Sequence, residues 1–279
     1  MDHKPIVVVV ARQRSGTTAL NLTLSKDPSL HSFGEIFHDA LSPEAHPHFG
    51  QLRLHAEANY FAFRMSALSS TPALSVPTKE HQHLLFRSFL AHLSSLTEKP
   101  KLLLDIKYNS MHHFDPVWHG REEPPALLGL LKEVDAILIH VVRKNHFERY
   151  CSEQLARARK TWHAETGQDV PDVKIKINPA QALRVMERSQ REIAYVQKLI
   201  ESYPRRVELP YEEMFSGDRI SDSAQAILRT VLGPEIDLLR PVPLQKLAGR
   251  PETHVGNMRE VSAFFARTRF APLFAGYGG

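Results

Sequence analysis

The most constraining feature of the sequence is a short apolar run near its start that leads into a polar, glycine-containing turn. Residues Ile6–Ala11 read I-V-V-V-V-A, and R-Q-R-S-G-T-T follows them, with leucines at positions 20, 22 and 24 beyond. A run rich in β-branched residues and without polar interruption is typical of a strand that is buried on both faces. The sequence therefore predicts a strand, a tight loop and a helix over residues 17–25, which is the opening unit of a parallel sheet.

Further apolar runs extend this pattern along the chain. Strands are predicted at residues 101–106, 136–142 and 206–209, and helices at residues 81–96, 125–133, 146–161, 179–203 and 221–232. Strands that alternate with helices imply a parallel sheet with right-handed crossovers. We therefore expect one α/β domain over residues 1–279, a three-layer sheet flanked by helices. Residues 233–260 are rich in proline and glycine and are expected to form a long functional loop or lid.

Composition and charge argue against several classes of protein. The chain has 279 residues, a formal net charge of +4 and a single cysteine, Cys151, which excludes an intrachain disulfide and a cysteine-based zinc cluster. The basic residues are spread out, which argues against nucleic-acid binding and weakly for small anionic ligands. The apolar run at residues 6–11 is too short for a membrane span or a signal peptide. We expect a cytoplasmic protein without stable membrane insertion.

The turn after the first strand has the position of a phosphate-binding loop, because backbone N–H groups and the helix dipole favour an anion there. Compared with the Walker A pattern G-x-x-x-x-G-K-[ST], Ala11 replaces the first glycine and Thr17 replaces the lysine. Arg14 supplies positive charge instead, and Ser15, Thr17 and Thr18 supply hydroxyl groups. The alternative is that Ser15 or Thr17 only caps the helix.

The pentapeptide Arg14-Ser15-Gly16-Thr17-Thr18 resembles the loop [KR]-S-G-T-T of sulfotransferases that use 3'-phosphoadenosine 5'-phosphosulfate (PAPS). The resemblance implies a P-loop-type fold and transfer of a sulfuryl group from PAPS to an acceptor hydroxyl. It also implies that the pentapeptide, Gly16 included, binds the 5'-phosphosulfate.

A second segment, which follows the strand at residues 136–142, agrees with this resemblance. Members of the family bind the 3'-phosphate through an arginine at the end of such a strand and a serine eight or nine residues later, and Arg143 and Ser152 fit these roles. A guanidinium and a hydroxyl two helical turns on can bind one phosphate. Lys144 is a competing candidate, and the alternative is an arginine and a serine without a ligand.

Two weaker resemblances follow in the expected order. Residues 211–214, Y-E-E-M, resemble a segment after a late strand of the family, for which we expect a structural role. Residues 247–261 resemble the loop that covers the nucleotide, with Asn257 and Arg259 as expected phosphate contacts.

The acceptor hydroxyl must lose its proton during attack, so a base is needed within hydrogen-bond reach. The second apolar strand ends D-I-K-Y-N and lacks the histidine of the aryl and steroid enzymes of the family. Gly34-Glu35-Ile36-Phe37 instead resembles the G-E-P-F segment of bacterial enzymes similar to trehalose sulfotransferase. The resemblance implies that Glu35 is the base and that the acceptor is a carbohydrate or glycolipid. Lys107 is expected to stabilise charge, and His38 is the alternative base.

Other functions are less consistent with the sequence. The histidine pairs 46/48, 81/83 and 112/113 lack a third ligand at a recognisable spacing, so no metal is expected. A kinase of small metabolites is disfavoured because the Walker lysine is missing and Asp105, the one candidate for Mg²⁺, lies within an apolar run. A non-catalytic nucleotide-binding module remains open, as does a homo-oligomer. Trp118 and Trp162 are candidates to line an acceptor pocket.

Overall fold

The computed structural model describes residues 3–38, 56–115 and 123–277. His46, His48 and Trp118, which are named above, lie outside these residues. The chain divides into two compact units. Unit 1 comprises residues 1–142 and 197–242, and unit 2 comprises residues 143–196 and 243–279.

Unit 1 is built on a five-stranded parallel sheet. Its strands, in the order β2-β3-β1-β4-β5, are β2 (Leu30–Glu35), β3 (Lys101–Lys107), β1 (Ile6–Ala11), β4 (Ile137–Val142) and β5 (Arg206–Pro210). Every residue of β1 is buried, because β1 is the central strand and both of its faces are covered. From β1 the chain passes to β2 on one side of β1, whereas from β3 it passes to β4 on the other side of β1. Ligands of parallel α/β sheets bind at the carboxyl ends of the strands beside such a reversal.

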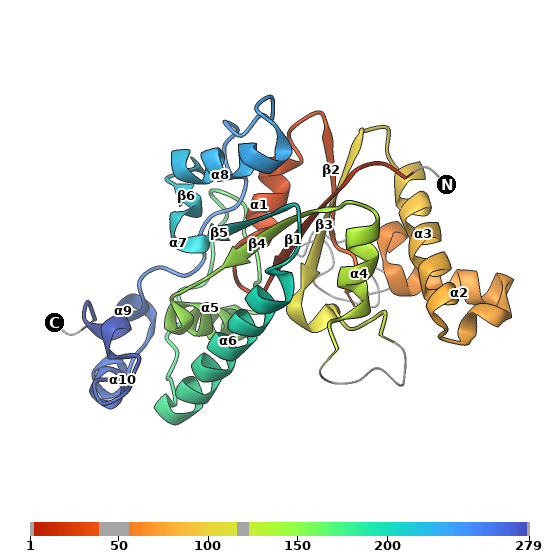
Figure 1. The fold of residues 1–279 in the computed structure, drawn as a ribbon. Helices are drawn as coiled ribbons and strands as arrows, with labels where there is room; N and C mark the ends of the chain where they lie inside the picture. The colour runs from red at the N-terminus through yellow and green to blue at the C-terminus, as the bar shows by residue number, and fades with distance from the viewer. Residues whose placement is uncertain (1–2, 39–55, 116–122, 278–279) are drawn as a thin grey trace. The chain divides into compact units, whose positions relative to one another are not determined.

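Helices cover both faces of this sheet. Helices α1 (Thr17–Leu24) and α8 (Asp222–Leu232) pack with alternate residues of β1 and β4 in one apolar core. Right-handed crossovers place the helices that follow β2 and β3 on the opposite face. These are α3 (Lys79–Ser95) and α4 (Ala126–Glu133), and Figure 1 shows them on that side. The expected three-layer α/β fold is confirmed.

Smaller elements complete unit 1. They are η1 (Ala56–Ala58), α2 (Tyr60–Ser70), η2 (Pro72–Ser75), η3 (Tyr108–Ser110), α7 (Tyr211–Met214) and the two-stranded sheet of β6 (Phe215–Ser216) and β7 (Arg219–Ile220). On the face of α3 and α4, buried His140 of β4 lies between the Tyr108 hydroxyl, 2.6 Å from its Nε2, and a Glu208 carboxylate oxygen, 3.3 Å from its Nδ1.

Unit 2 has a separate apolar core. Its helices are α5 (His146–Arg159), the larger part of α6 (Pro179–Ile200), α9 (Pro251–His254), α10 (Met258–Phe265) and η4 (Ala271–Phe274). Phe147 of α5 and Phe265 of α10 lie in this core, where the rings of Phe265 and Phe274 stack at 4.4 Å. In the described residues this unit has isolated β-bridges and no strand of the five-stranded sheet.

The segment 233–260, expected to form a long functional loop or lid, includes helical residues. It contains the single turn α9 and the first three residues of α10. Pro251 occupies the first turn of α9, where a proline lacks no hydrogen bond. Val261 and Phe265 are four residues apart and bury one face of α10. The prolines and glycines of this segment therefore separate short helices and do not prevent helix formation.

Candidate active site at the end of the central strands

The loop between β1 and α1 has the backbone geometry of an anion site. Arg14 and Gly16 both adopt left-handed conformations, with φ of 66° and 75°. Gly16 is the N-cap of α1, and among the described residues no side chain caps it. Alternating left-handed residues at an uncapped helix start point backbone N–H groups into one concavity. The capping alternative for Ser15 and Thr17 is therefore not what the structure adopts.

Gly16 is required for a second reason, which explains the Y-E-E-M segment. A Cβ atom at this position would lie 2.8 Å from the Tyr211 ring and 3.0 Å from the Met214 methyl group. Helix α7 thus packs directly against the loop. This contact agrees with the structural role expected for residues 211–214.

Lys107, at the end of β3, brings a positive charge to the start of α1. Its Nζ lies 2.5 Å from the Thr17 Oγ1 and 2.7 and 2.8 Å from the two carboxylate oxygens of Asp105. Glu35 Oε1, on the neighbouring strand β2, is 3.3 Å away. The cation that a Walker loop carries at the position of Thr17 therefore comes here from another strand.

The charges in this cluster depend on one another. Burial raises the pKa of Asp105 above its ordinary value, and Lys107 opposes that rise. Burial alone would lower the pKa of Lys107, but the charges of Asp105 and Glu35 outweigh it and raise this pKa. Asn21 Nδ2 donates to Asp105 Oδ2 at 3.0 Å. Because Asp105 is bound by an ammonium and an amide, it is poorly placed to hold Mg²⁺ as a kinase requires.

Glu35 is placed by an irregularity in β2. Ser32 pairs with Leu103 and Gly34 with Leu104, so Phe33 is an extra residue and forms a β-bulge. Gly34 has φ of 66°, a conformation that favours glycine. Bulges re-aim the side chains that follow them. The Gly-Glu pair singled out from the sequence therefore directly follows a bulge and places a carboxylate at the strand end.

A cavity of about 340 Å³ opens between α1 and β2. Its lining includes Thr18 and Asn21 of α1, Ser32 and Glu35 of β2, and Asp105. Thr18, the last residue of the expected phosphate-binding pentapeptide, and both carboxylates thus border one space. Sequence reasoning missed Asn21 and Ser32, since neither belongs to a motif. His38, the alternative base, follows β2, and its backbone N–H donates to the Glu35 carbonyl.

Unit 2 holds the second predicted phosphate site. Arg143 is 4% exposed, and its guanidinium lies 3.4 Å from Glu148 Oε2. The Tyr277 hydroxyl donates to the other oxygen of Glu148. Ser152 is buried one turn beyond Glu148, on the same face of α5. The residues therefore lie in a buried polar patch of unit 2, where Glu148 already contacts Arg143.

The two C-terminal candidates differ from each other. The Asn257 side chain accepts from the Ile177 N–H and donates to the Ile177 carbonyl and to Glu260, at 2.9, 2.8 and 3.0 Å. Its amide thus ties the start of α10 to the segment before α6. Arg259 is exposed on the first turn of α10. A phosphate could bind Arg259 without breaking these bonds.

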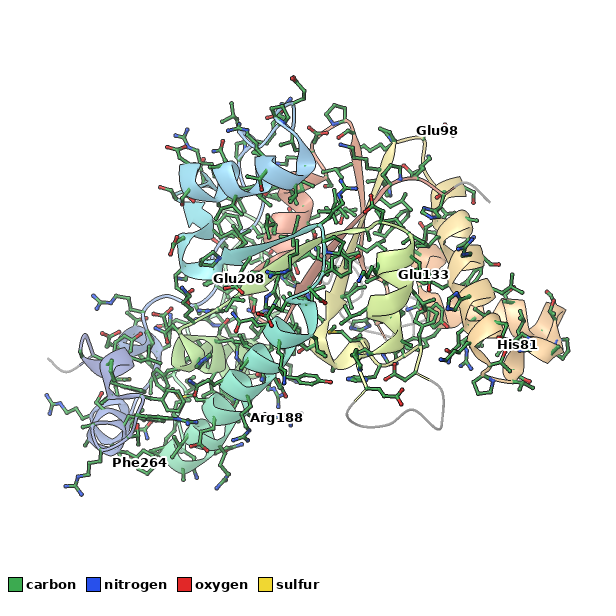
Figure 2. All side chains as sticks on the ribbon, viewed as in Figure 1. His81, Glu98, Glu133, Arg188, Glu208 and Phe264 are labelled. Carbon is green, nitrogen blue, oxygen red and sulfur yellow. The ribbon has the colours of Figure 1, made fainter. Side chains whose placement is uncertain are left out.

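The remaining candidates are dispersed. His81 lies in the first turn of α3 (Figure 2), with its Nδ1 2.7 Å from the Val76 carbonyl. His112 lies 2.5 Å from Asp115. Over the described residues, three or more histidine, cysteine or acidic side chains do not come together at any point. Trp162 lies in unit 2.

Of the helices that the structure describes, none is both long and apolar enough to cross a membrane.

The chain was also compared with known proteins and solved structures. No protein-family model and no curated protein matches the chain. The chain is similar to the crystal structure of a sulfotransferase from Alicyclobacillus acidocaldarius, with 12% sequence identity, a TM-score of 0.42, and coverage of 95% of this chain and 92% of that chain.

Proposed function

We propose that the protein is a sulfotransferase that moves the sulfuryl group of PAPS to a hydroxyl of a small or carbohydrate acceptor, with a sugar or glycolipid as the preferred class. The observation that carries the proposal is the cluster at the start of α1. An uncapped helix terminus, a loop with two left-handed residues and the Lys107 ammonium converge where the sequence resembles a 5'-phosphosulfate loop. Glu35 lies in the same cluster.

The proposed step needs one base and stabilised charge. The acceptor oxygen attacks sulfur, and its proton moves to a carboxylate oxygen of Glu35. The bond between sulfur and the bridging oxygen breaks, which yields a sulfate ester and 3',5'-bisphosphoadenosine. The backbone N–H groups of residues 14–18 and the Lys107 ammonium stabilise the charge on that oxygen. Positioning and electrostatics supply most of the acceleration, as they do in phosphoryl transfer.

In unit 2, we propose that Arg143 and Ser152 bind the 3'-phosphate and that Arg259 is an additional contact. Arg143 is buried, and one N–H group of its guanidinium lies 3.4 Å from Glu148 Oε2. Phosphate would compete with the Glu148 carboxylate for the guanidinium. Charge-assisted hydrogen bonds of this kind contribute about 1.5 to 3 kcal/mol each.

The test combines turnover with nucleotide affinity. Glu35→Gln keeps the size of the side chain but cannot accept the proton, so PAPS-dependent turnover with a pooled set of sugars, lipids and phenols should fall about a hundredfold to ten-thousandfold. Affinity for 3',5'-bisphosphoadenosine, measured by calorimetry, should stay within about twofold. His38→Asn is the matched control and should retain turnover. Collapse in His38→Asn with normal turnover in Glu35→Gln would move the base to His38.

Nucleotide selectivity tests the rest of the site. The protein should bind 3',5'-bisphosphoadenosine at least about tenfold more tightly than AMP or ATP, because only the first carries a 3'-phosphate. Arg14→Ala and Arg143→Ala should weaken this binding. Arg149, which is buried on α5 and pairs with Glu153 at 3.1 Å, should affect stability more than affinity when replaced by alanine. Equal affinity for ATP would contradict the proposed function.

A further inference from the structure

We propose that the groove between α1 and β2 is the acceptor subsite and that it selects a neutral, hydroxyl-rich molecule of about monosaccharide size. This inference rests on the sulfotransferase function proposed above, and it assigns to the acceptor a place and a chemistry that the motifs do not. It is drawn from the lining of the 340 Å³ cavity.

The groove is one face of a helix opposite a strand. Thr18, Asn21, Leu22 and Ser25 line it at intervals of three and four residues, the spacing of a single helix face. Across from them, β2 is an edge strand of the sheet. The bulge at Phe33 matters here, because Ser32 and Glu35 would face opposite sides of a regular strand. With one extra residue between them, both side chains border the groove.

The polar atoms of the groove favour a ligand that donates hydrogen bonds. The Asn21 side chain is 3% exposed, and no described residue donates to its Oδ1. The Glu35 carboxylate and the Ser32 hydroxyl add further acceptors. A buried amide oxygen without a donor costs free energy, so a ligand hydroxyl that reached it would bind favourably. Acceptors on both walls of the groove, Asn21 on α1 and Ser32 and Glu35 on β2, match the spaced hydroxyls of a polyol.

The charges of the groove argue for a neutral ligand. Lys107 is held by Asp105 and Glu35, as described above. Lys99 lines the far end, but its ammonium donates to three backbone carbonyls, those of Ser25, Asp27 and Leu30, at 2.7 to 2.9 Å. An ammonium has three N–H donors, so Lys99 has none left for an anionic substituent. A carboxylated or phosphorylated acceptor would therefore gain no free N–H donor from Lys99.

The competing location is aromatic. Beyond the end of β2, Phe37 packs edge to face on Tyr60 and Phe114, whose own rings are tilted to each other, with ring centroids 4.6 to 5.9 Å apart. All three side chains are buried, so their faces already contact one another. A phenolic acceptor would need such a surface to be open. Among the described residues, the groove between α1 and β2 is an open space that borders Glu35, and its hydrogen-bond acceptors favour an aliphatic polyol.

The test blocks the groove by covalent modification of a cysteine introduced at position 32. Cys151 is buried, and burial raises the pKa of its thiol to about 12, so it reacts slowly in the native state. N-ethylmaleimide will therefore modify a Ser32→Cys variant at position 32 alone, which intact-mass spectrometry checks. Ser95→Cys, on the exposed end of α3, is the matched control. Saturation-transfer NMR then measures binding of methyl glycosides, trehalose, myo-inositol and 4-nitrophenol in the presence of 3',5'-bisphosphoadenosine.

We expect at least one polyol to bind the unmodified Ser32→Cys variant and to lose at least about tenfold in affinity after modification. The Ser95→Cys protein should bind it equally before and after. Unchanged polyol binding by the modified Ser32→Cys protein would overturn the proposal, as would absence of polyol binding or preferential binding of 4-nitrophenol. Calorimetry with 3',5'-bisphosphoadenosine distinguishes failure of the proposed function from failure of the acceptor subsite. Absence of nucleotide binding by the wild-type protein contradicts the proposed function, whereas nucleotide binding without a polyol site contradicts only the groove.

Discussion

At the scale of single residues, Lys107 is a buried cation that keeps its charge because two carboxylates lie beside it. It is 5% exposed, and Asp105 is almost completely buried. A lysine that loses such partners tends to lose its proton, and a carboxylate that loses its cation tends to gain one. The cluster is therefore stable as a set, and removal of one member changes the titration of the others.

Lys107→Met tests this coupling. Methionine fills a similar volume but leaves Asp105 buried without its cation, so its pKa, already raised, rises further. A group with a raised pKa in the folded state stabilises the fold at low pH, and this stability is lost as the pH rises through that pKa. The free energy of unfolding should therefore fall below that of the wild type by about 3 kcal/mol at pH 8, and the gap should narrow toward pH 4. Urea unfolding at several pH values measures it.

Asp105→Asn in the Lys107→Met background is the control. It removes the titrating group, so the difference in stability from the wild type should lose most of its dependence on pH. A gap that stays constant from pH 4 to pH 8 in the single variant would show that Asp105 does not sense Lys107.

The sequence identifies only part of this cluster. Glu35 follows from a family resemblance and Lys107 from its position at a strand end, and Asp105 is recognised only as a candidate magnesium ligand. Its actual partners lie 2 and 84 positions away in the chain, at Lys107 and Asn21. A strand places residues i and i+2 on one face, so the first contact is accessible to pattern reasoning. The second depends on how α1 packs on the sheet, which no local pattern contains.

At the scale of elements, two features fix the conformation of the loop before α1. These are its left-handed backbone residues and its packing against α7. Gly16→Ala adds a Cβ both to a left-handed residue and to a space occupied by Tyr211 and Met214. Backbone strain and overpacking together should lower the free energy of unfolding by about 2 to 4 kcal/mol and weaken binding of 3',5'-bisphosphoadenosine. Chemical denaturation and calorimetry measure the two effects.

Gly129→Ala is the matched control for this substitution. Gly129 lies within α4, and no described atom beyond the helix backbone comes within 4 Å of a Cβ at that position. Alanine favours helices over glycine by about 1 kcal/mol, so this variant should be slightly more stable. Equal stability of Gly16→Ala and the wild type would mean that α7 can move away from the loop without cost.

The accuracy of the predicted elements follows how each one is buried. Strands β1, β3 and β4 are covered on both faces and are mostly apolar, and their predicted bounds agree with the structure to within one residue. Strand β2 was missed, because it is an edge strand whose buried residues are only Leu30 and Phe33 and whose bulge breaks the alternation. Helix α2 was missed as well, since only Tyr60 is fully buried and no apolar stripe forms.

At the scale of the whole molecule, the two units differ in what holds them together. Unit 1 has a central sheet, whereas unit 2 is formed from two chain segments around one cluster of apolar side chains. Cys151, the single cysteine, lies in that cluster and is 2% exposed. Its thiol therefore reports on unit 2 alone. Because the pKa is raised to about 12, little thiolate exists at pH 8 and modification must wait for the unit to open.

We predict that 3',5'-bisphosphoadenosine slows modification of Cys151 by a thiol reagent such as 5,5'-dithiobis(2-nitrobenzoate). If Arg143 and Ser152 bind the 3'-phosphate, the nucleotide binds unit 2 in its closed form and stabilises it by about 2.7 kcal/mol at a hundred times Kd, which corresponds to about a hundredfold slower modification. Arg143→Ala should abolish most of this protection. Arg188→Ala, which changes an exposed arginine of α6 (Figure 2), should leave it intact. Equal rates with and without saturating nucleotide would mean that unit 2 does not bind it, and the assignment of Arg143 and Ser152 would then be wrong even if the loop of unit 1 binds the 5'-phosphate.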